Sequence, residues 1–212
     1  MRAGKHSRLF TLEEESQLIS DHYSWFWAQY SRLPLEVRAS VGRYFVLHRY
    51  GGVWLASGVA PLRTLDTVLL PDGHAVLGYQ VLPRKQLSDP AAVWDGFIAA
   101  PARHPFLNFV INRLEEGAHN ADLADDPVGA AFITRCARLF ELSDQEGADT
   151  LTVHPMPTVA LVHQQYPFRR IDRIRKQLCD TNLEKCQKEF PDTYLTQSAQ
   201  LSRAELKCHQ NK

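Results

Sequence analysis

Few residues of this chain have a type and spacing that could do chemistry on their own. Histidine is the commonest general base near neutral pH, but no histidine here has a recognisable cysteine or serine partner that it could activate. Ser57 follows no nucleophile-elbow pattern. No complete catalytic set is therefore visible from residue types alone. The histidines considered are His48, His104, His154 and His163.

Charged clusters offer two further possibilities, metal binding and phosphate binding. The acidic segment 122–126 lacks the alternating ligands and the mid-loop glycine of a calcium-binding loop, so we interpret it as a solvated loop. The basic run from Arg169 to Lys176 could touch phosphate or lipid headgroups. Asp172 and Asp180 interrupt this basic stretch, and a solvated helical face is the simpler interpretation.

Composition limits the class of protein. The chain has 212 residues, of which 44% are hydrophobic, which suits one domain with a proper core and argues against wholesale disorder. Lys and Arg together number 24, as do Asp and Glu, so the chain lacks the basic excess of a nucleic-acid binder. It contains no apolar run of about 18 residues and no signal-peptide core, so we expect a soluble chain without a transmembrane segment.

The cysteines show no Cys-x-x-Cys spacing. We favour isolated reduced thiols, while Cys179 and Cys186 could form a disulfide in an oxidising lumen. The remaining two are Cys136 and Cys208.

The elements that must position any reactive side chain begin near the N-terminus. Thr11 and Glu14 form a Thr-x-x-Glu capping box, which predicts a helix through about Tyr23. We interpret the aromatic segment 25–30 that follows as core. The next helix is predicted to start near Pro34, with apolar residues at helical spacing. A pair of glycines then supplies the left-handed backbone that ends this helix. A short buried strand is predicted at 53–55. The apolar residues are Val37, Val41 and Phe45, and the glycines are Gly51 and Gly52.

Later segments repeat these two patterns. Residues 75–81 and 158–162 have the apolar runs of buried strands. Pro105 begins a helix with an apolar face, and a further helix runs to Phe140. Both helices are expected to pack through their apolar side chains, which are Phe106, Phe109, Val110 and Leu114 in the first and Phe132, Ile133 and Leu139 in the second.

The stretch from Arg38 to Leu62 resembles the sugar-binding region of glycosyltransferase family 32, which includes α-mannosyltransferases and inositolphosphoceramide mannosyltransferases. The family pattern is Ala-Asp-x-x-Arg-Tyr followed, after a few residues, by Tyr-Gly-Gly-x-Tyr-x-Asp-x-Asp-x-x-Pro-Leu. The departures fall where the chemistry should be, because Ser40 replaces the first Asp and residues 56–58 replace Asp-x-Asp. The matching residues are Ala39, Arg43, Tyr44, Tyr50, Gly51, Gly52, Pro61 and Leu62, with Trp54 in the aromatic position.

The missing acids matter because a nucleotide-sugar donor brings a diphosphate. Mn²⁺ or Mg²⁺ needs carboxylate oxygens to hold it against those phosphates. Ala56 and Gly58 offer no side-chain ligand, and Ser57 offers only a weak neutral one. We therefore expect no metal site and no cofactor, with Mn²⁺ or Mg²⁺ relevant only if residual activity exists.

Two further segments carry the resemblance. The block from Trp94 to Phe106 resembles the family's Asn-x-Phe and His-Pro-Phe segments. Asp95 is in the Asn position, and the resemblance implies that its side chain faces the sugar. The alternative is an aspartate at a strand edge. The resemblance likewise implies that Arg43 faces the donor nucleotide, the alternative being a surface arginine. Near the C-terminus Tyr194 and Ser202 match a closing segment in which Gln197, Ala199 and Arg203 replace a His and two Trp.

The fold that the resemblance implies is α/β, a GT-A-like glycosyltransferase fold with a mixed central sheet flanked by helices. The chain starts downstream of the family's opening strand, so we expect this fold without its N-terminal strand. We accordingly expect residues 1–212 to form a single truncated GT-A-like domain, with 204–212 as a flexible C-terminal tail. Fungal relatives imply the Golgi or endomembrane lumen as the compartment.

The function that the resemblance implies is a relation to enzymes that transfer a mannose-type hexose from a nucleotide sugar to a glycan or glycolipid acceptor. Because the metal-binding acids are absent, we expect impaired catalysis and assign no catalytic residue. The alternative is a non-catalytic pseudo-glycosyltransferase that acts as partner or stabiliser of an active glycosyltransferase. The expected partners are a nucleotide sugar or such an enzyme, and no nucleic acid. The vestigial donor-binding residues are Arg43, Gly51, Gly52, Ser57 and Asp95.

Overall fold

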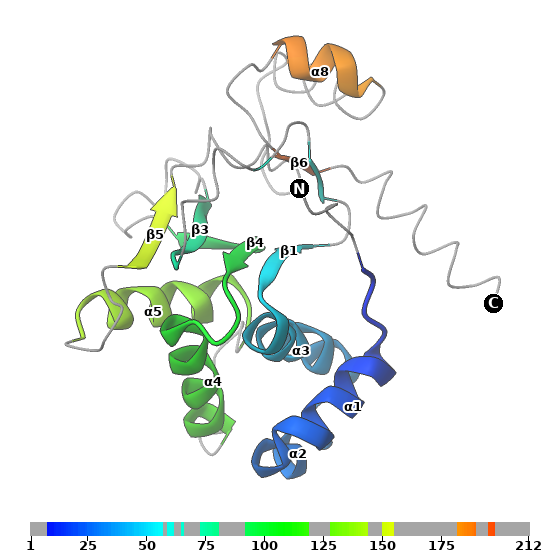
Figure 1. The fold of residues 1–212 in the computed structure, drawn as a ribbon, viewed down its shortest axis with the longest axis vertical. Coiled ribbons are helices and arrows are strands. Elements are labelled where there is room, and N and C mark those ends of the chain that lie inside the picture. Colours follow the sequence, from blue (N-terminus) through cyan, green and yellow to red (C-terminus); the bar gives the residue numbers. More distant parts are fainter. Residues whose placement is uncertain are drawn as a thin grey trace, which may run out of the picture.

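The structure is a computed structural model of the chain. It describes residues 8–56, 59–61, 65, 73–80, 92–118, 128–143, 150–154, 182–189 and 195–197. Within these ranges, helices pack on a mixed four-stranded sheet, and two further strands form a separate small sheet (Figure 1).

Three helices open the described chain: α1 (Leu12–His22), α2 (Ser24–Tyr30) and α3 (Leu35–Tyr50). The predicted capping box of α1 is confirmed. The hydroxyl of Thr11 accepts a hydrogen bond from the N–H of Glu14 at 3.2 Å, and the N–H of Thr11 donates to the Glu14 carboxylate at 2.9 Å. Pro34 directly precedes α3, as predicted, and α1 packs along α3.

The turn after α3 requires its first glycine. Gly51 has a φ of 67°, and its N–H closes the helix by donating to the carbonyl of Leu47 at 2.8 Å. A Cβ at this position would lie 2.5 Å from the backbone nitrogen of Ala102, so the chain has no room for a side chain there. The predicted left-handed glycine turn is therefore confirmed.

The four-stranded sheet has the order β1-β4-β3-β5. β4 pairs antiparallel with both β1 and β3, whereas β3 pairs parallel with β5, so the predicted mixed sheet is confirmed. The second sheet pairs β2 with β6 antiparallel. The strands are β1 (Gly52–Leu55), β2 (Val59–Pro61), β3 (Ala75–Gln80), β4 (Ala92–Ala100), β5 (Leu151–His154) and β6 (Leu195–Gln197).

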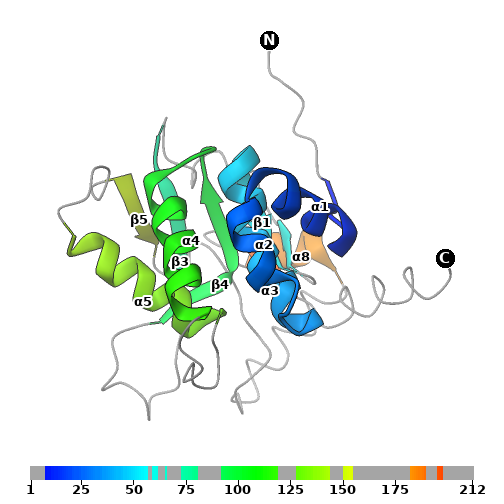
Figure 2. The ribbon, with the colours of Figure 1, turned by 90° about the horizontal axis from the view of Figure 1, so that it is seen from below.

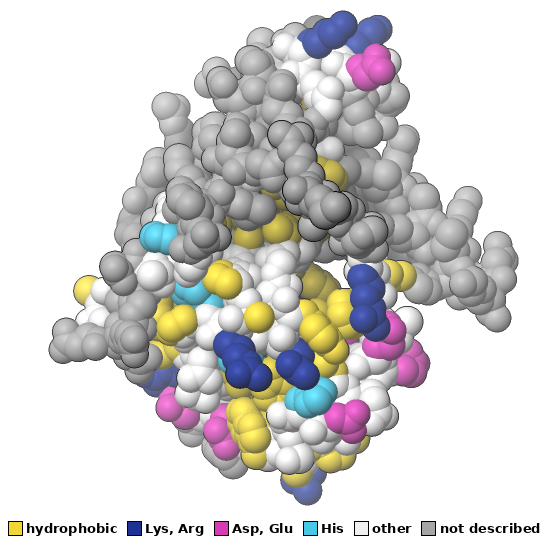
Figure 3. Space-filling view, in the orientation of Figure 1, with side chains coloured by type: hydrophobic (Ala, Val, Ile, Leu, Met, Phe, Trp, Pro, Cys, Tyr) yellow, Lys and Arg dark blue, Asp and Glu magenta, His cyan; other side chains and the backbone are white. Residues whose placement is uncertain are grey.

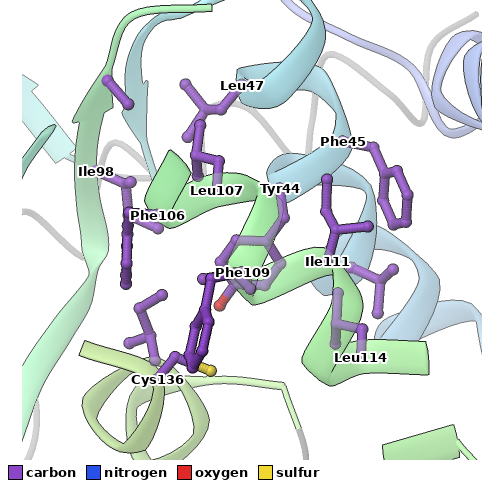
Figure 4. Packing of buried hydrophobic residues seen from close by; sticks show 14 of the residues in the cluster. Tyr44, Phe45, Leu47, Ile98, Phe106, Leu107, Phe109, Ile111, Leu114 and Cys136 are labelled. Carbon is purple, nitrogen blue, oxygen red and sulfur yellow. The ribbon is translucent and has the colours of Figure 1, made fainter. Parts of the chain in front are cut away.

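Helices α4 (Pro105–Ala118) and α5 (Ala130–Glu141) pack with α3 on one side of the four-stranded sheet (Figures 1 and 2). The predicted apolar face of α4 is confirmed, since all four of its side chains are buried. Figure 4 shows how α4 side chains meet Tyr44 of α3, Ile98 of β4 and Cys136 of α5. This shared core fixes α3 relative to β4, the two elements that carry the site described below.

Some side chains depart from the sequence prediction. Only one side of the short helix α2 faces the core, so Phe26 and Tyr30 are buried while Trp25 and Trp27 are 47% and 37% exposed. Leu139 of α5 is exposed instead of packing inward. Strand β1 is half-buried where a buried strand was predicted. Strand β5 has no counterpart among the strands predicted from the sequence.

Several predictions concern residues outside the described ranges. These are the acidic segment 122–126, the strand at 158–162, the basic run at 169–176 and the tail at 204–212. Helix α8 (Leu183–Glu189) is described within the C-terminal region. The predicted absence of an N-terminal strand stays a prediction.

The described surface mixes both signs of charge. Figure 3 shows both basic and acidic side chains on the helical half of the molecule. Among the described residues, no helix combines the length and the apolar character needed to cross a membrane.

One cysteine departs from the prediction of reduced thiols. Cys186 of α8 is disulfide-bonded and fully buried. Cys136 is free, so the partner of Cys186 lies outside the described residues.

Candidate functional site

The candidate site is built around a bulge in the central strand β4. Leu77 of β3 pairs with Ile98, but the next residue, Gly78, pairs with Trp94, so residues 95–97 have no partner on β3. On the other side of β4, the N–H of Ala56 donates to the carbonyl of Gly96 at 2.9 Å. A bulge bends its strand and redirects side chains, and such bulges are over-represented beside active sites. The bulge lies beside Ala56, at the end of β1.

A glycine and a tryptophan shape this bulge. A Cβ at Gly96 would lie 2.2 Å from the ring of Trp94, so the indole occupies the space that a side chain at position 96 would need. Trp94 is buried, and Phe97 on the far side of the glycine is buried too. The Trp-Asp-Gly-Phe sequence thus anchors apolar side chains on both sides of Asp95.

Arg43 of α3 holds the bulge from the helical side. Its Nη1 donates to the carbonyl of Asp95 at 2.9 Å and to the Asp95 carboxylate at 3.0 Å, while its Nε donates to the carbonyl of Ser40 at 2.8 Å. Arg43 is only 6% exposed, so the alternative of a surface arginine is wrong. The Asp95 side chain is 30% exposed and lies in the bulge, where β4 has no partner on β3, so the interpretation of Asp95 as an aspartate at an unpaired strand position stands beside the sugar-facing one.

A second carboxyl group, which the sequence analysis did not identify, lies nearby on α1. Glu15 is 3% exposed, and its Oε2 has no hydrogen-bond partner. Burial raises the pKa of Glu15 to about 7, although the positive charge of Arg43 acts in the opposite direction. The available signal was its spacing, since Glu15 lies three and four residues before Leu18 and Ile19 on the buried side of α1.

The predicted donor-binding residues do not all gather at this place. The structure brings Arg43 and Asp95 together, and Ala56 lies beside them through its bond to Gly96. Gly51 and Gly52 lie at the opposite end of β1, where Gly52 pairs with Ala100. Their observed contribution is the turn that places β1. Ser57 and Gly58 lie outside the described residues.

The described residues of this site do not supply a metal-ligand set. Ala56 has no ligand atom in its side chain, and the Asp95 carboxylate is bonded to Arg43. Within the described ranges, no group of three or more His, Cys, Asp or Glu residues is placed to hold a metal ion. These residues therefore do not fit the divalent cation that the family pattern implies.

Two of the histidines considered have partners inside the fold. Nδ1 of His48 is 2.7 Å from the hydroxyl of Tyr23, and burial lowers the pKa of His48. Nδ1 of His104 accepts the N–H of Phe106 at 3.1 Å, and its Nε2 lies 2.9 Å from the hydroxyl of Thr150. Burial lowers the pKa of His104 too. His48 thus connects α3 to the residue after α1, and His104 connects the loop before α4 to the residue before β5.

Part of this chain is similar to a known family of glycosyltransferases. Residues 4–73 match the family described as "Glycosyltransferase sugar-binding region containing DXD motif". This match covers α1 to β2 and includes both Glu15 and Arg43. The predicted resemblance to the mannosyltransferase-type glycosyltransferases of family 32 is confirmed.

Two proteins named as mannosyltransferases are similar to about half of this chain. Inositol phosphoceramide mannosyltransferase 3 of Schizosaccharomyces pombe is 34% identical over 113 residues, which are 53% of this chain and 29% of that protein. Inositol phosphoceramide mannosyltransferase 2 of the same organism is 32% identical over 111 residues, or 52% of this chain and 29% of that protein. The match thus spans about three tenths of the length of these relatives.

Proposed function

We propose that this chain carries the donor side of a nucleotide-sugar-dependent glycosyltransferase, with impaired sugar transfer. The observation that carries the proposal is the Arg43–Asp95 pair, which joins α3 to the β4 bulge directly beside Ala56. This pair unites the two blocks of sequence that resemble the family.

The chemistry expected of these residues is binding and orientation. Asp95 is partly exposed, so its carboxylate can accept hydrogen bonds from a sugar hydroxyl while Arg43 fixes its position. Arg43 itself is committed to two carbonyls and one carboxylate, which leaves it a supporting role behind the bulge. Transfer is expected to be weak because Ala56 and Gly58 provide no ligand for the cation that would offset charge on the departing nucleotide.

The proposed donor is a nucleotide-linked hexose of the mannose type, and the proposed acceptor is a glycan or glycolipid. The support is the likeness to proteins named inositol phosphoceramide mannosyltransferases. For the compartment we propose the Golgi or another endomembrane lumen. The disulfide at Cys186 supports an oxidising surrounding.

A second candidate function is a non-catalytic partner or stabiliser of an active glycosyltransferase. The observation that favours it is the absence of a side-chain ligand at Ala56, at the point where β1 meets the bulge. Under this alternative the Arg43–Asp95 pair maintains the fold of the partner surface without a bound donor.

Thermal stability in the presence of donors separates these proposals. We expect GDP-mannose, or else UDP-glucose or UDP-galactose, to raise the melting temperature equally with and without Mn²⁺, because binding to the folded state stabilises it. Asp95→Asn should weaken this shift, whereas Glu116→Gln, which removes one exposed carboxylate on α4, should leave it unchanged. A shift that needs Mn²⁺ would contradict the impaired metal site.

Transfer itself is measured with radiolabelled GDP-mannose and simple mannoside or inositol-phospholipid acceptors. We expect the native chain to form no measurable product, and Ala56→Asp combined with Gly58→Asp to introduce Mn²⁺-dependent donor binding. No donor-dependent shift in any of the three titrations would overturn the donor site and leave the non-catalytic partner as the better proposal.

A further inference from the structure

The buried carboxyl group of Glu15 has no assigned role in the proposed donor site. It lies where α1 packs on α3, and its Oε2 is fully buried without a hydrogen-bond partner. Buried polar atoms are nearly always bonded, so an unpartnered carboxyl oxygen inside a well-packed helix pair calls for an explanation. Its protonated form is much cheaper to bury than its ionised form.

The contact between the two helices is close at this point. Glu15 packs against Gly42, where a Cβ would lie 2.2 Å from Oε2, so α3 needs a glycine to admit the carboxyl group. The next residue on α3 is Arg43. The carboxyl group of α1 thus packs on α3 one residue before Arg43, whose positive charge favours ionisation of Glu15.

The charged and titratable groups around Glu15 come from every element packed on it. Glu14 of α1 disfavours its ionisation, Arg43 of α3 favours it, and Tyr30 of α2 is a neutral neighbour whose own pKa is raised by burial. Asp95 of β4 belongs to this group of charges because its carboxylate is bonded to Arg43. Arg43 therefore interacts electrostatically with both carboxyl groups, of which only Asp95 is bonded to it.

We propose that Glu15 is a proton-controlled positioning residue for the β4 bulge. While protonated, Glu15 leaves the Arg43 guanidinium to Asp95 and to the carbonyl of the bulge. Once ionised, it competes with Asp95 for Arg43 and loosens the contact that holds residues 95–97. This inference concerns the state of the bulge and holds whether or not the bulge binds a nucleotide sugar.

The size of the effect follows from proton linkage. The pKa of Glu15 is raised to about 7 from an ordinary value of 4.5, so the state in which Glu15 is buried and unbonded retains its proton up to neutral pH. In the competing state, ionised Glu15 contacts Arg43 and the bulge is loosened. If Glu15 has its ordinary pKa in that state, the population of the state relative to the one with a bonded bulge rises about tenfold between pH 6 and pH 8. A group that titrates only near pH 4.5 in both states would give no change in that interval.

Amide hydrogen exchange measured by mass spectrometry tests this. Peptides covering β4 are followed at pH 6 and pH 8, after correction for intrinsic exchange, and peptides covering α4 report opening of the whole domain. In the native chain we expect the protection of residues 95–97 to fall about tenfold from pH 6 to pH 8 while it stays below that of α4, whose own protection falls because Glu15 also lowers the global stability. A bulge that opens without Glu15 would instead keep its protection while that of α4 falls. Glu15→Gln should abolish the fall in the protection of residues 95–97.

Matched variants make the result decisive. Glu13→Gln removes a carboxylate of the same type from the exposed side of α1 and should keep the native pH response. Glu15→Met fills a similar volume without a proton and should behave like Glu15→Gln, which covers the case in which the glutamine variant folds poorly. A native chain without the pH response, or a Glu15→Gln or Glu15→Met variant that retains it, would overturn the proposal.

Discussion

At the scale of single residues, the candidate site consists of one buried cation and two carboxyl groups of different character. Asp95 bonds Arg43 and remains partly exposed, whereas Glu15 is buried with an unbonded oxygen. Removing one partner of a buried ion pair is more costly than the pair is worth, because it leaves an uncompensated charge inside the protein. The two carboxyl groups should therefore respond differently to mutation.

Asp95→Asn should destabilise the fold because it leaves the Arg43 guanidinium without its bonded carboxylate. Buried pairs lose about 3–5 kcal/mol on such a change, and the partial exposure of Asp95 reduces our expectation to about 1–3 kcal/mol. Urea unfolding at pH 6 gives the free energy. Glu116→Gln breaks an exposed pair with Arg113 and should cost at most about 0.5 kcal/mol; equal losses in the two variants would contradict a structural Arg43–Asp95 pair.

Glu15 should make the free energy of unfolding depend on pH in the opposite sense to most carboxylates. Its pKa is raised in the folded state, so the native protein binds the proton more tightly than the unfolded chain does. The stability from this group is complete below pH 4.5 and is lost as the pH rises through about 7, a loss of roughly 3 kcal/mol. Glu15→Gln should remove this component, which thermal unfolding between pH 4.5 and pH 8 would measure, with Glu13→Gln as the unchanged control.

At the scale of elements, the α3–β1 turn and the β4 bulge place the site. Both depend on glycines with no room for a side chain, since Gly51 lies against the backbone at Ala102 and Gly96 lies under the Trp94 ring. The N–H of Arg103 also donates to the carbonyl of His48 at 2.8 Å, which ties the loop after β4 to the end of α3. The geometry of Arg43 and Asp95 thus rests on two tight backbone contacts.

Gly51→Ala and Gly52→Ala separate steric crowding from backbone strain. Both glycines have positive φ, of 67° and 107°, so both alanine variants are strained. Only position 51 is crowded, because nothing lies within 4 Å of a Cβ at Gly52. We expect Gly51→Ala to cost about 1–3 kcal/mol more than Gly52→Ala in urea unfolding, and similar losses in the two variants would contradict the close approach of Ala102.

At the scale of the whole molecule, local patterns predicted most of the helices, and tertiary contacts decided the rest. The capping box at Thr11, the glycine turn at Gly51 and the apolar face of α4 could be predicted because each depends on neighbours in sequence. Strand β5 could not, since its four residues gain their place by pairing with β3 across the fold. Trp25 and Trp27 were misjudged because a seven-residue helix buries only one of its sides.

The same division applies to the candidate site. The resemblance singled out Arg43 and Asp95, but nothing in the sequence showed that they bond to each other across 52 residues. Glu15 escaped notice because a glutamate in a helix is ordinarily solvated, and its burial arises from Gly42 on another helix. Long-range packing, which sequence patterns do not encode locally, determines the electrostatics of this site.

The disulfide at Cys186 bears on the stability of the whole chain and on its compartment. Cys136 is free, so the partner of Cys186 lies outside the described residues, and a disulfide that closes a short loop restricts the unfolded chain by about 3 kcal/mol. A reducing agent should therefore lower the melting temperature of the native chain, and Cys186→Ser should lower it by a similar amount and abolish the response to reduction. Cys136→Ser, which removes the buried free thiol, should leave the response to reduction intact. A native chain with four titratable thiols after purification without reductant would contradict the disulfide and remove the support it gives to an oxidising lumen.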